Sequence, residues 1–153
     1  MTQWLTRAFP PSRRCRSCTS FASWAAQTKA SLSTNTPKPP ADCPPDVETL
    51  GRSSWTLLHS IAAQYPESPS ATQQSDLLGF VRLFAKLYPC WTCAEDFQAY
   101  IARRQPVVGS RGDFGNWLCD AHNDVNRKLG KPEFDCKLWE ERWRTGWKDG
   151  RCD

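Results

Sequence analysis

Cysteine is the residue type in this sequence with the clearest capacity for chemistry. The chain has 153 residues and contains eight cysteines, at positions Cys15, Cys18, Cys43, Cys90, Cys93, Cys119, Cys136 and Cys152. Two of the pairs have the Cys-x-x-Cys spacing, which serves both redox-active dithiols and halves of zinc sites. The first question is therefore whether these pairs exchange electrons or bind a metal ion.

The Cys90–Cys93 pair carries the strongest signal, because it follows Pro89 and precedes a helix predicted over residues 94–103. The positive end of a helix dipole and its unpaired N–H groups stabilise a thiolate, which is the nucleophilic form of cysteine. We therefore expect a redox-active disulfide. The alternatives are an inert structural pair, or a zinc site shared with Cys15 and Cys18. More than 70 residues separate the two halves of that zinc site, which is unusually far for zinc ligands.

Residues 1–42 have the composition of a disordered, flexible tail, rich in Ser, Thr, Pro and Arg. Residues 1–41 contain six basic and no acidic residues, whereas residues 42–153 contain 14 basic and 16 acidic residues. The folded domain, residues 43–153, is therefore a poor candidate for binding nucleic acid. A tethered Cys15–Cys18 dithiol can shuttle electrons to another disulfide, although the tail also resembles a mitochondrial presequence. No apolar run approaches the roughly 18 residues of a membrane span, and no secretory signal is apparent.

Hydrophobic periodicity predicts helices over residues 46–65, 70–88, 94–103 and 114–129, with a short fifth helix capped by Asp135. Strand-like alternation is absent. We therefore predict an all-α fold, a four-helix bundle plus a short fifth helix. On that fifth helix Trp139, Trp143 and Trp147 recur every four residues, which predicts that their rings form one stripe.

Two further pairs of cysteines bear on the stability and assembly of the fold. Sixteen residues lie between Cys119 and Cys136, and a bridge between them would stabilise the fold by about 3 kcal/mol. Cys43 and Cys152 lie at the two ends of the folded part and can pair within one chain or across a symmetric dimer.

The sequence contains eight tryptophans and two histidines, with amide and lysine donors nearby. These side chains can enclose a planar heterocycle and hold a phosphate, or simply fill the core. A dithiol enzyme must pass its electrons onward, which favours a redox cofactor.

Four sequence blocks resemble the FAD-linked sulfhydryl oxidases of the Erv/ALR family, most closely its mitochondrial members. They are LGRSSWTLLH at 50–59, YPCWTCAED at 88–96, HNDVNRKLGKP at 122–132 and ERWR at 141–144. The tail motif CRSC at 15–18, followed by Phe21 and Trp24, resembles the long form of those mitochondrial members. The resemblance implies a helical bundle that binds FAD, with Cys93 beside the flavin and Cys90 as the sulfur that an incoming thiolate attacks.

The resemblance also assigns roles to other positions. Thirteen positions are implied to contact FAD: Gly51, Arg52, Trp55, His59, Cys119, His122, Asn123, Val125, Asn126, Lys128, Lys131, Arg142 and Trp143. Cys119 and Cys136 are implied to form a structural disulfide, and Cys43 and Cys152 to form two intersubunit disulfides of a homodimer. No metal site is implied.

The implied function is a thiol oxidase that generates disulfides. Electrons would pass from a protein dithiol, a Mia40-type oxidoreductase, through Cys15–Cys18 to Cys90–Cys93, then to FAD and finally to O2 or cytochrome c. The implied location is the mitochondrial intermembrane space, which would explain disulfides in a chain without a secretory signal. Two alternatives are a zinc-stapled binding module without enzymatic activity and a structural dimer whose Cys-x-x-Cys pairs are inert.

Overall fold

The computed structural model describes residues 42–152 and is built from helices alone. The elements are α2 (Val47–Gln64), α3 (Ala71–Leu87), α4 (Trp91–Arg103), α5 (Arg111–Leu129), the 3₁₀-helix η1 (Cys136–Leu138) and the short π-helix η2 (Glu141–Thr145). The described residues contain no strand, so the predicted all-α bundle with a short helical segment after it is confirmed. The tail motif Cys15–Cys18 lies outside the described residues.

The helices begin and end where the sequence provides capping groups. Asp46 accepts a hydrogen bond from a backbone N–H of the first turn of α2. Ser70 and Gln73 form a reciprocal capping box at the start of α3. Gly130 ends α5 in the left-handed region at φ 67°, where glycine has no steric penalty. The boundaries of these helices are therefore set by local sequence signals.

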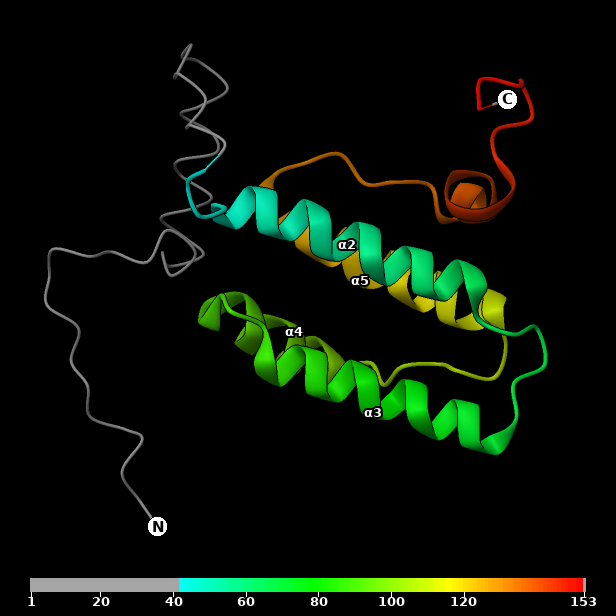
Figure 1. Ribbon diagram of the computed structural model, residues 1–153, viewed down its shortest axis with the longest axis horizontal. Helices are drawn as coiled ribbons and strands as arrows, with labels where there is room; N and C mark the ends of the chain where they lie inside the picture. Colours follow the sequence, from blue (N-terminus) through cyan, green and yellow to red (C-terminus); the bar gives the residue numbers. More distant parts are fainter. Residues whose placement is uncertain (1–41, 153) are drawn as a thin grey trace, which may run out of the picture.

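The helices are arranged as two pairs. Figure 1 shows α2 beside α5 and α3 beside α4, with η2 lying over α2. Phe114 and Leu118 of α5 and Val81 of α3 are almost completely buried in the core between the pairs. This packing places α4, and the cysteines at its start, next to α2 and α5.

The C-terminal helical segment is shorter than predicted. η2 ends at Thr145 because Gly146 adopts φ 80°, which is outside helical geometry. Trp147 therefore lies beyond the helix, and the prediction that it continues the stripe of Trp139 and Trp143 is wrong. Its ring instead lies 4.9 Å from the guanidinium carbon of Arg151.

Two disulfides are present among the described residues. Cys119 and Cys136 connect α5 to η1, with their Cα atoms 5.9 Å apart, and Cys90 and Cys93 are bonded at the start of α4, with their Cα atoms 5.3 Å apart. Cys43 and Cys152 are free thiols. No helix in the described part of the chain is long and apolar enough to cross a membrane.

Candidate functional site

A cavity of about 420 Å³ lies between α2, α5 and the segment that follows α5. Twelve of the thirteen positions that the resemblance assigned to FAD line it: Gly51, Arg52, Trp55, His59, Cys119, His122, Asn123, Val125, Asn126, Lys131, Arg142 and Trp143. Their convergence follows from helical periodicity, because residues three or four positions apart share one helix face. The cavity is within the size range of cofactor sites.

Lys128 is the thirteenth position, and the structure places it outside the lining. Its Nζ lies 2.6 Å from an Asp96 oxygen and 2.5 Å from an Asp124 oxygen. The ammonium therefore bridges α4 and α5. A direct contact of Lys128 with a cofactor stays a prediction.

Two stacked pairs of aromatic rings line the cavity. The rings of Trp55 and His122 stack with their centroids 4.2 Å apart and an interplanar angle of 5°. The rings of His59 and Trp143 stack at 4.5 Å and 9°. Trp55 and His59 are one turn apart on α2, whereas their partners come from α5 and η2. Flat, apolar walls of this kind suit a planar heterocyclic ligand.

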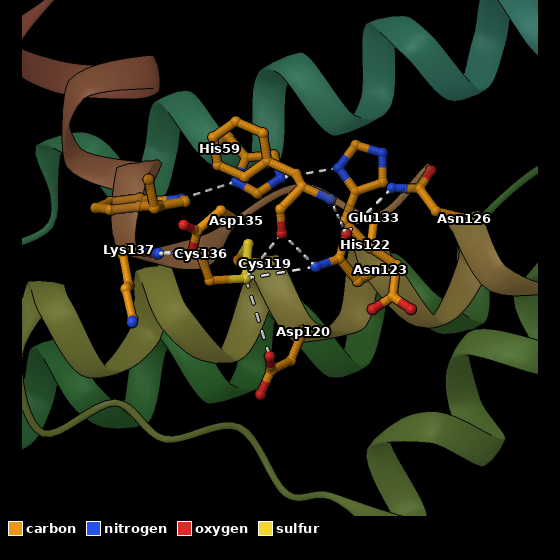
Figure 2. Close-up of a disulfide and its surroundings, with 12 residues drawn as sticks. His59, Cys119, Asp120, His122, Asn123, Asn126, Glu133, Asp135, Cys136 and Lys137 are labelled. Carbon is orange, nitrogen blue, oxygen red and sulfur yellow. Dashed lines mark hydrogen bonds between the residues drawn. A yellow bond between two sulfur atoms is a disulfide. The ribbon is translucent and has the colours of Figure 1, made fainter. Parts of the chain in front are cut away.

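The two histidines are joined to each other and are held neutral. His59 Nε2 and His122 Nδ1 are 3.1 Å apart, and Figure 2 marks this contact between the two rings with a dashed line. Burial lowers the pKa of His59 to about 3, with further contributions from His122 and Arg142. Burial, followed by the charge of Lys131, lowers the pKa of His122 to about 4. Both imidazoles are therefore uncharged at neutral pH.

Positive side chains gather at the cavity. Arg52, Lys131 and Arg142 all line it, and the Arg142 guanidinium carbon lies 4.4 Å from the centroid of the Trp143 ring. Glu48 is 2.6 Å from Arg52 and 3.9 Å from Lys131, so it draws two of these cations together. Arginine and lysine donors of this kind suit a phosphate or diphosphate group.

A hollow of about 80 Å³ adjoins the cavity, and Cys93 is among the residues that line it. Gly51, Trp55 and Val125 line both spaces. Cys93 is in the first turn of α4, because the helix begins at Trp91, three residues earlier than predicted. A thiolate on Cys93 is therefore next to the cavity and at the positive end of a helix.

The segment around Phe134, between α5 and η1, is held by the amide side chain of Asn123. Asn123 donates to the backbone oxygen of Phe134 at 2.8 Å and accepts from its backbone N–H at 2.9 Å. Its amide nitrogen also lies 3.5 Å from Cys136 Sγ, and its oxygen accepts from Asn126 at 3.3 Å. Figure 2 shows Asn123 beside the Cys119–Cys136 disulfide. The hydrogen-bonding capacity of this amide is therefore used to fix the wall of the cavity. We call these hydrogen bonds between Asn123 and Phe134 the Asn123 clamp.

Some lining residues have no counterpart in the sequence-based prediction. They are Val47, Glu48, Thr56, Leu129 and Phe134. Helical spacing from Arg52 and Trp55 could have identified the α2 members of this set. Phe134 is placed by the Asn123 clamp, for which the sequence contains no periodic signal.

Comparison with known proteins agrees with this arrangement. Residues 52–144 match the model of the Erv1 / Alr family. The chain belongs to the Erv1/Alr family. The matched residues include α2 from Arg52 onward, the Cys90–Cys93 disulfide and η2 up to Arg144, so the family match covers most of the cavity lining and this disulfide.

Similar proteins of the Erv1/Alr family have been described and solved. The chain is 55% identical over 106 residues to the mitochondrial FAD-linked sulfhydryl oxidase ERV1 of Saccharomyces cerevisiae, an alignment that covers 69% of this chain and 56% of that protein. The chain thus spans little more than half the length of this relative. The yeast Erv1 core structure matches with a TM-score of 0.70 at 50% identity, covering 76% of this chain and 98% of that one. The FAD binding domain of S. cerevisiae Erv1 matches with a TM-score of 0.67 at 53% identity, covering 69% and 100% of the two chains.

The zinc alternative is not favoured by the comparisons, because the similar proteins are named FAD-linked sulfhydryl oxidases. Cys90 and Cys93 are bonded to each other, and a disulfide sulfur is not the thiolate that zinc requires.

Proposed function

We propose that this chain is an FAD-linked thiol oxidase that generates disulfides in protein substrates. The observation that carries the proposal is the direct adjacency of a redox disulfide, through the hollow containing Cys93, to a cavity with aromatic walls and a positive rim. The FAD-linked sulfhydryl oxidases among the relatives support it. Bound FAD supplies an acceptor for the two electrons of a dithiol.

The residues present fit FAD. The walls formed by Trp55, His122 and Trp143 suit the flat ring systems, and Arg52 and Lys131 suit the diphosphate. The hollow that Cys93 lines shares Gly51, Trp55 and Val125 with this cavity. The chain therefore offers every class of contact that the cofactor needs.

Thiol–disulfide exchange at the start of α4 delivers the electrons. A substrate thiolate attacks Cys90 Sγ, which forms a mixed disulfide and releases Cys93 as a thiolate. The second substrate thiol then attacks the mixed disulfide, so that the substrate leaves oxidised while Cys90 and Cys93 hold two electrons and the protons come from the substrate thiols. The N-terminal end of α4 stabilises the Cys93 thiolate.

Access to Cys90 requires a local movement. Cys90 is only 1% exposed, whereas Trp91 beside it is 55% exposed. An incoming thiolate must reach the sulfur along the axis of the S–S bond. The turn that joins α3 to α4 therefore has to shift when a substrate docks.

The visible spectrum tests the proposal most directly. The purified chain, or the chain reconstituted with FAD, is expected to show flavin absorbance near roughly 450 nm. Addition of a dithiol under air is expected to consume oxygen and produce hydrogen peroxide. A colourless protein that does not take up FAD would contradict the proposal, and zinc released on unfolding would favour the binding module instead.

The proposed partners supply electrons to the Cys90–Cys93 disulfide and accept them from FAD. A Mia40-type oxidoreductase is the thiol substrate, Cys15–Cys18 is the shuttle, and O2 or cytochrome c is the final acceptor. The proposed location is the mitochondrial intermembrane space, and the mitochondrial naming of the S. cerevisiae relative supports a mitochondrial location.

The shuttle has a specific test. Replacement of Cys15 and Cys18 together by serine is expected to leave oxidation of dithiothreitol unchanged, because a small dithiol reaches Cys90 without a carrier. Oxidation of a protein substrate such as Mia40 is expected to fall at least roughly 10-fold, because the tether supplies a high local concentration of the relay dithiol. Oxygen consumption measured with each substrate compares the two. Equal rates on both substrates would mean that the tail has no relay function.

A disulfide-linked homodimer is part of the proposal. Cys43 and Cys152 are free within a single chain, and the chain enters α2 at one end of the molecule while the C-terminus lies toward the other (Figure 1). A head-to-tail dimer would bring these opposite ends together twice, as a two-fold axis requires.

A further inference from the structure

A buried tryptophan is connected to the cavity by a chain of hydrogen bonds. Trp139 Nε1 donates to His59 Nδ1 at 3.0 Å, and His59 Nε2 is 3.1 Å from His122 Nδ1. Trp139 is 3% exposed and does not line the cavity, whereas His122 does. The hydrogen bonds of the indole therefore reach the cavity through the two imidazoles.

The chemistry of the indole sets the direction of this chain. Indole Nε1 carries a hydrogen and is only a donor, so His59 Nδ1 must be the acceptor and carry no proton. A neutral His59 then has its proton on Nε2 and donates it to His122 Nδ1. A neutral His122 in turn has its proton on Nε2. Among the described residues, His122 Nε2 has no hydrogen-bond partner, so this N–H is left for a ligand in the cavity.

The position of Trp139 is tightly determined. A Cβ atom added at Gly115 would lie 2.6 Å from the Trp139 ring. The indole can therefore pack against α5 at this position only because residue 115 is glycine. Trp143 stacks on His59 and Trp55 stacks on His122. The rings therefore cannot turn over without disrupting several contacts at once.

We propose that Trp139 is a positioning residue that fixes His59 and His122 in their Nε2–H tautomers, so that His122 offers the cavity one N–H donor. A bound ligand must then place a hydrogen-bond acceptor, a ring nitrogen or an oxygen, opposite His122. This consequence for the ligand rests on the proposed function, in which the ligand is FAD. The depressed pKa values of both histidines, with Arg142 near His59 and Lys131 near His122, are consistent with this neutral chain.

Nitrogen NMR of the histidines tests the assignment without any ligand. The chain contains two histidines, so full-length protein labelled with 15N in His and Trp, with any affinity tag removed, gives two imidazole patterns. Both are expected to show Nε2 protonated and Nδ1 unprotonated at neutral pH. A scalar coupling across the hydrogen bond is expected between the indole nitrogen of Trp139 and His59 Nδ1. A protonated Nδ1 on either histidine would overturn the proposal.

Trp139→Phe provides the functional comparison. It removes the donor, and His59 is expected to lose its single tautomer while affinity for FAD falls roughly 2- to 10-fold, the effect of one hydrogen bond. Trp117→Phe is the matched control, because Trp117 is also buried and its indole donates to the backbone oxygen of Arg104 instead. Unchanged imidazole signals in folded Trp139→Phe would contradict the proposal. If Trp139→Phe does not fold, the wild-type spectrum still decides it.

The same experiments separate this inference from the proposed function. A protein with the expected tautomers that fails to bind FAD would contradict the FAD-linked oxidase but leave the positioning role of Trp139 intact. A yellow, active protein with a proton on His59 Nδ1 would support the FAD-linked oxidase and contradict the positioning role of Trp139.

Discussion

Replacement of Cys93 by serine is expected to abolish thiol oxidation while the protein still binds FAD. Cys93 lines the hollow that joins the cavity, and a serine hydroxyl can neither form the disulfide nor act as a thiolate. Turnover is expected to fall at least roughly 10³-fold, as for removal of a catalytic nucleophile. Oxygen consumption with dithiothreitol measures the loss, and the flavin absorbance of the same sample measures cofactor binding.

Cys152→Ser is the matched control for this loss of a sulfur atom. Cys152 is an exposed free thiol within one chain and lines neither of the two spaces that carry the proposed chemistry. Its replacement removes the proposed intersubunit disulfide but no sulfur of the Cys90–Cys93 exchange, so turnover of a small dithiol is expected to stay within about twofold of wild type. Wild-type turnover in Cys93→Ser would favour the structural dimer with inert Cys-x-x-Cys pairs.

The fold was largely predictable because its signals are local. The reciprocal cap of Ser70 and Gln73 and the left-handed Gly130 each depend on residues within one turn, so they can be recognised without tertiary information. Trp147 shows the limit of this reasoning. Four-residue spacing predicts a shared face only where the helix continues, and Gly146 ends it.

Most residues that line the cavity could be predicted, but the hydrogen bonds that connect them could not. Periodicity places His59 on one face of α2 and His122 on one face of α5, and the resemblance suggests that both faces meet a cofactor. Neither indicates that His59 bonds to Trp139, because that contact joins residues 80 positions apart. Likewise, nothing near Asn123 in the sequence indicates that its amide holds the segment around Phe134. Long-range hydrogen bonds depend on how elements pack, which a single sequence does not encode as a pattern.

The second large effect concerns the disulfide between α5 and η1. Replacing Cys119 and Cys136 together by alanine is expected to lower the free energy of unfolding by about 3 kcal/mol, because the bridge closes a loop between residues 17 positions apart. For a domain of this size that corresponds to a fall in Tm of roughly 10–15 °C. Thermal unfolding followed by circular dichroism, at one fixed FAD concentration, measures this fall in Tm.

Comparing the unfolding free energies of this variant and of Cys93→Ser shows how much stability each disulfide provides. Cys90 and Cys93 are 3 positions apart, so the same loop model assigns their disulfide roughly half the stabilisation of the Cys119–Cys136 bridge. The double alanine variant is also expected to bind FAD more weakly, because Cys119 lines the cavity and Cys136 neighbours the Asn123 clamp. A loss of less than about 1 kcal/mol, the value of a single hydrogen bond, would show that the Asn123 clamp and the core hold the segment. In that case the disulfide would have no structural role.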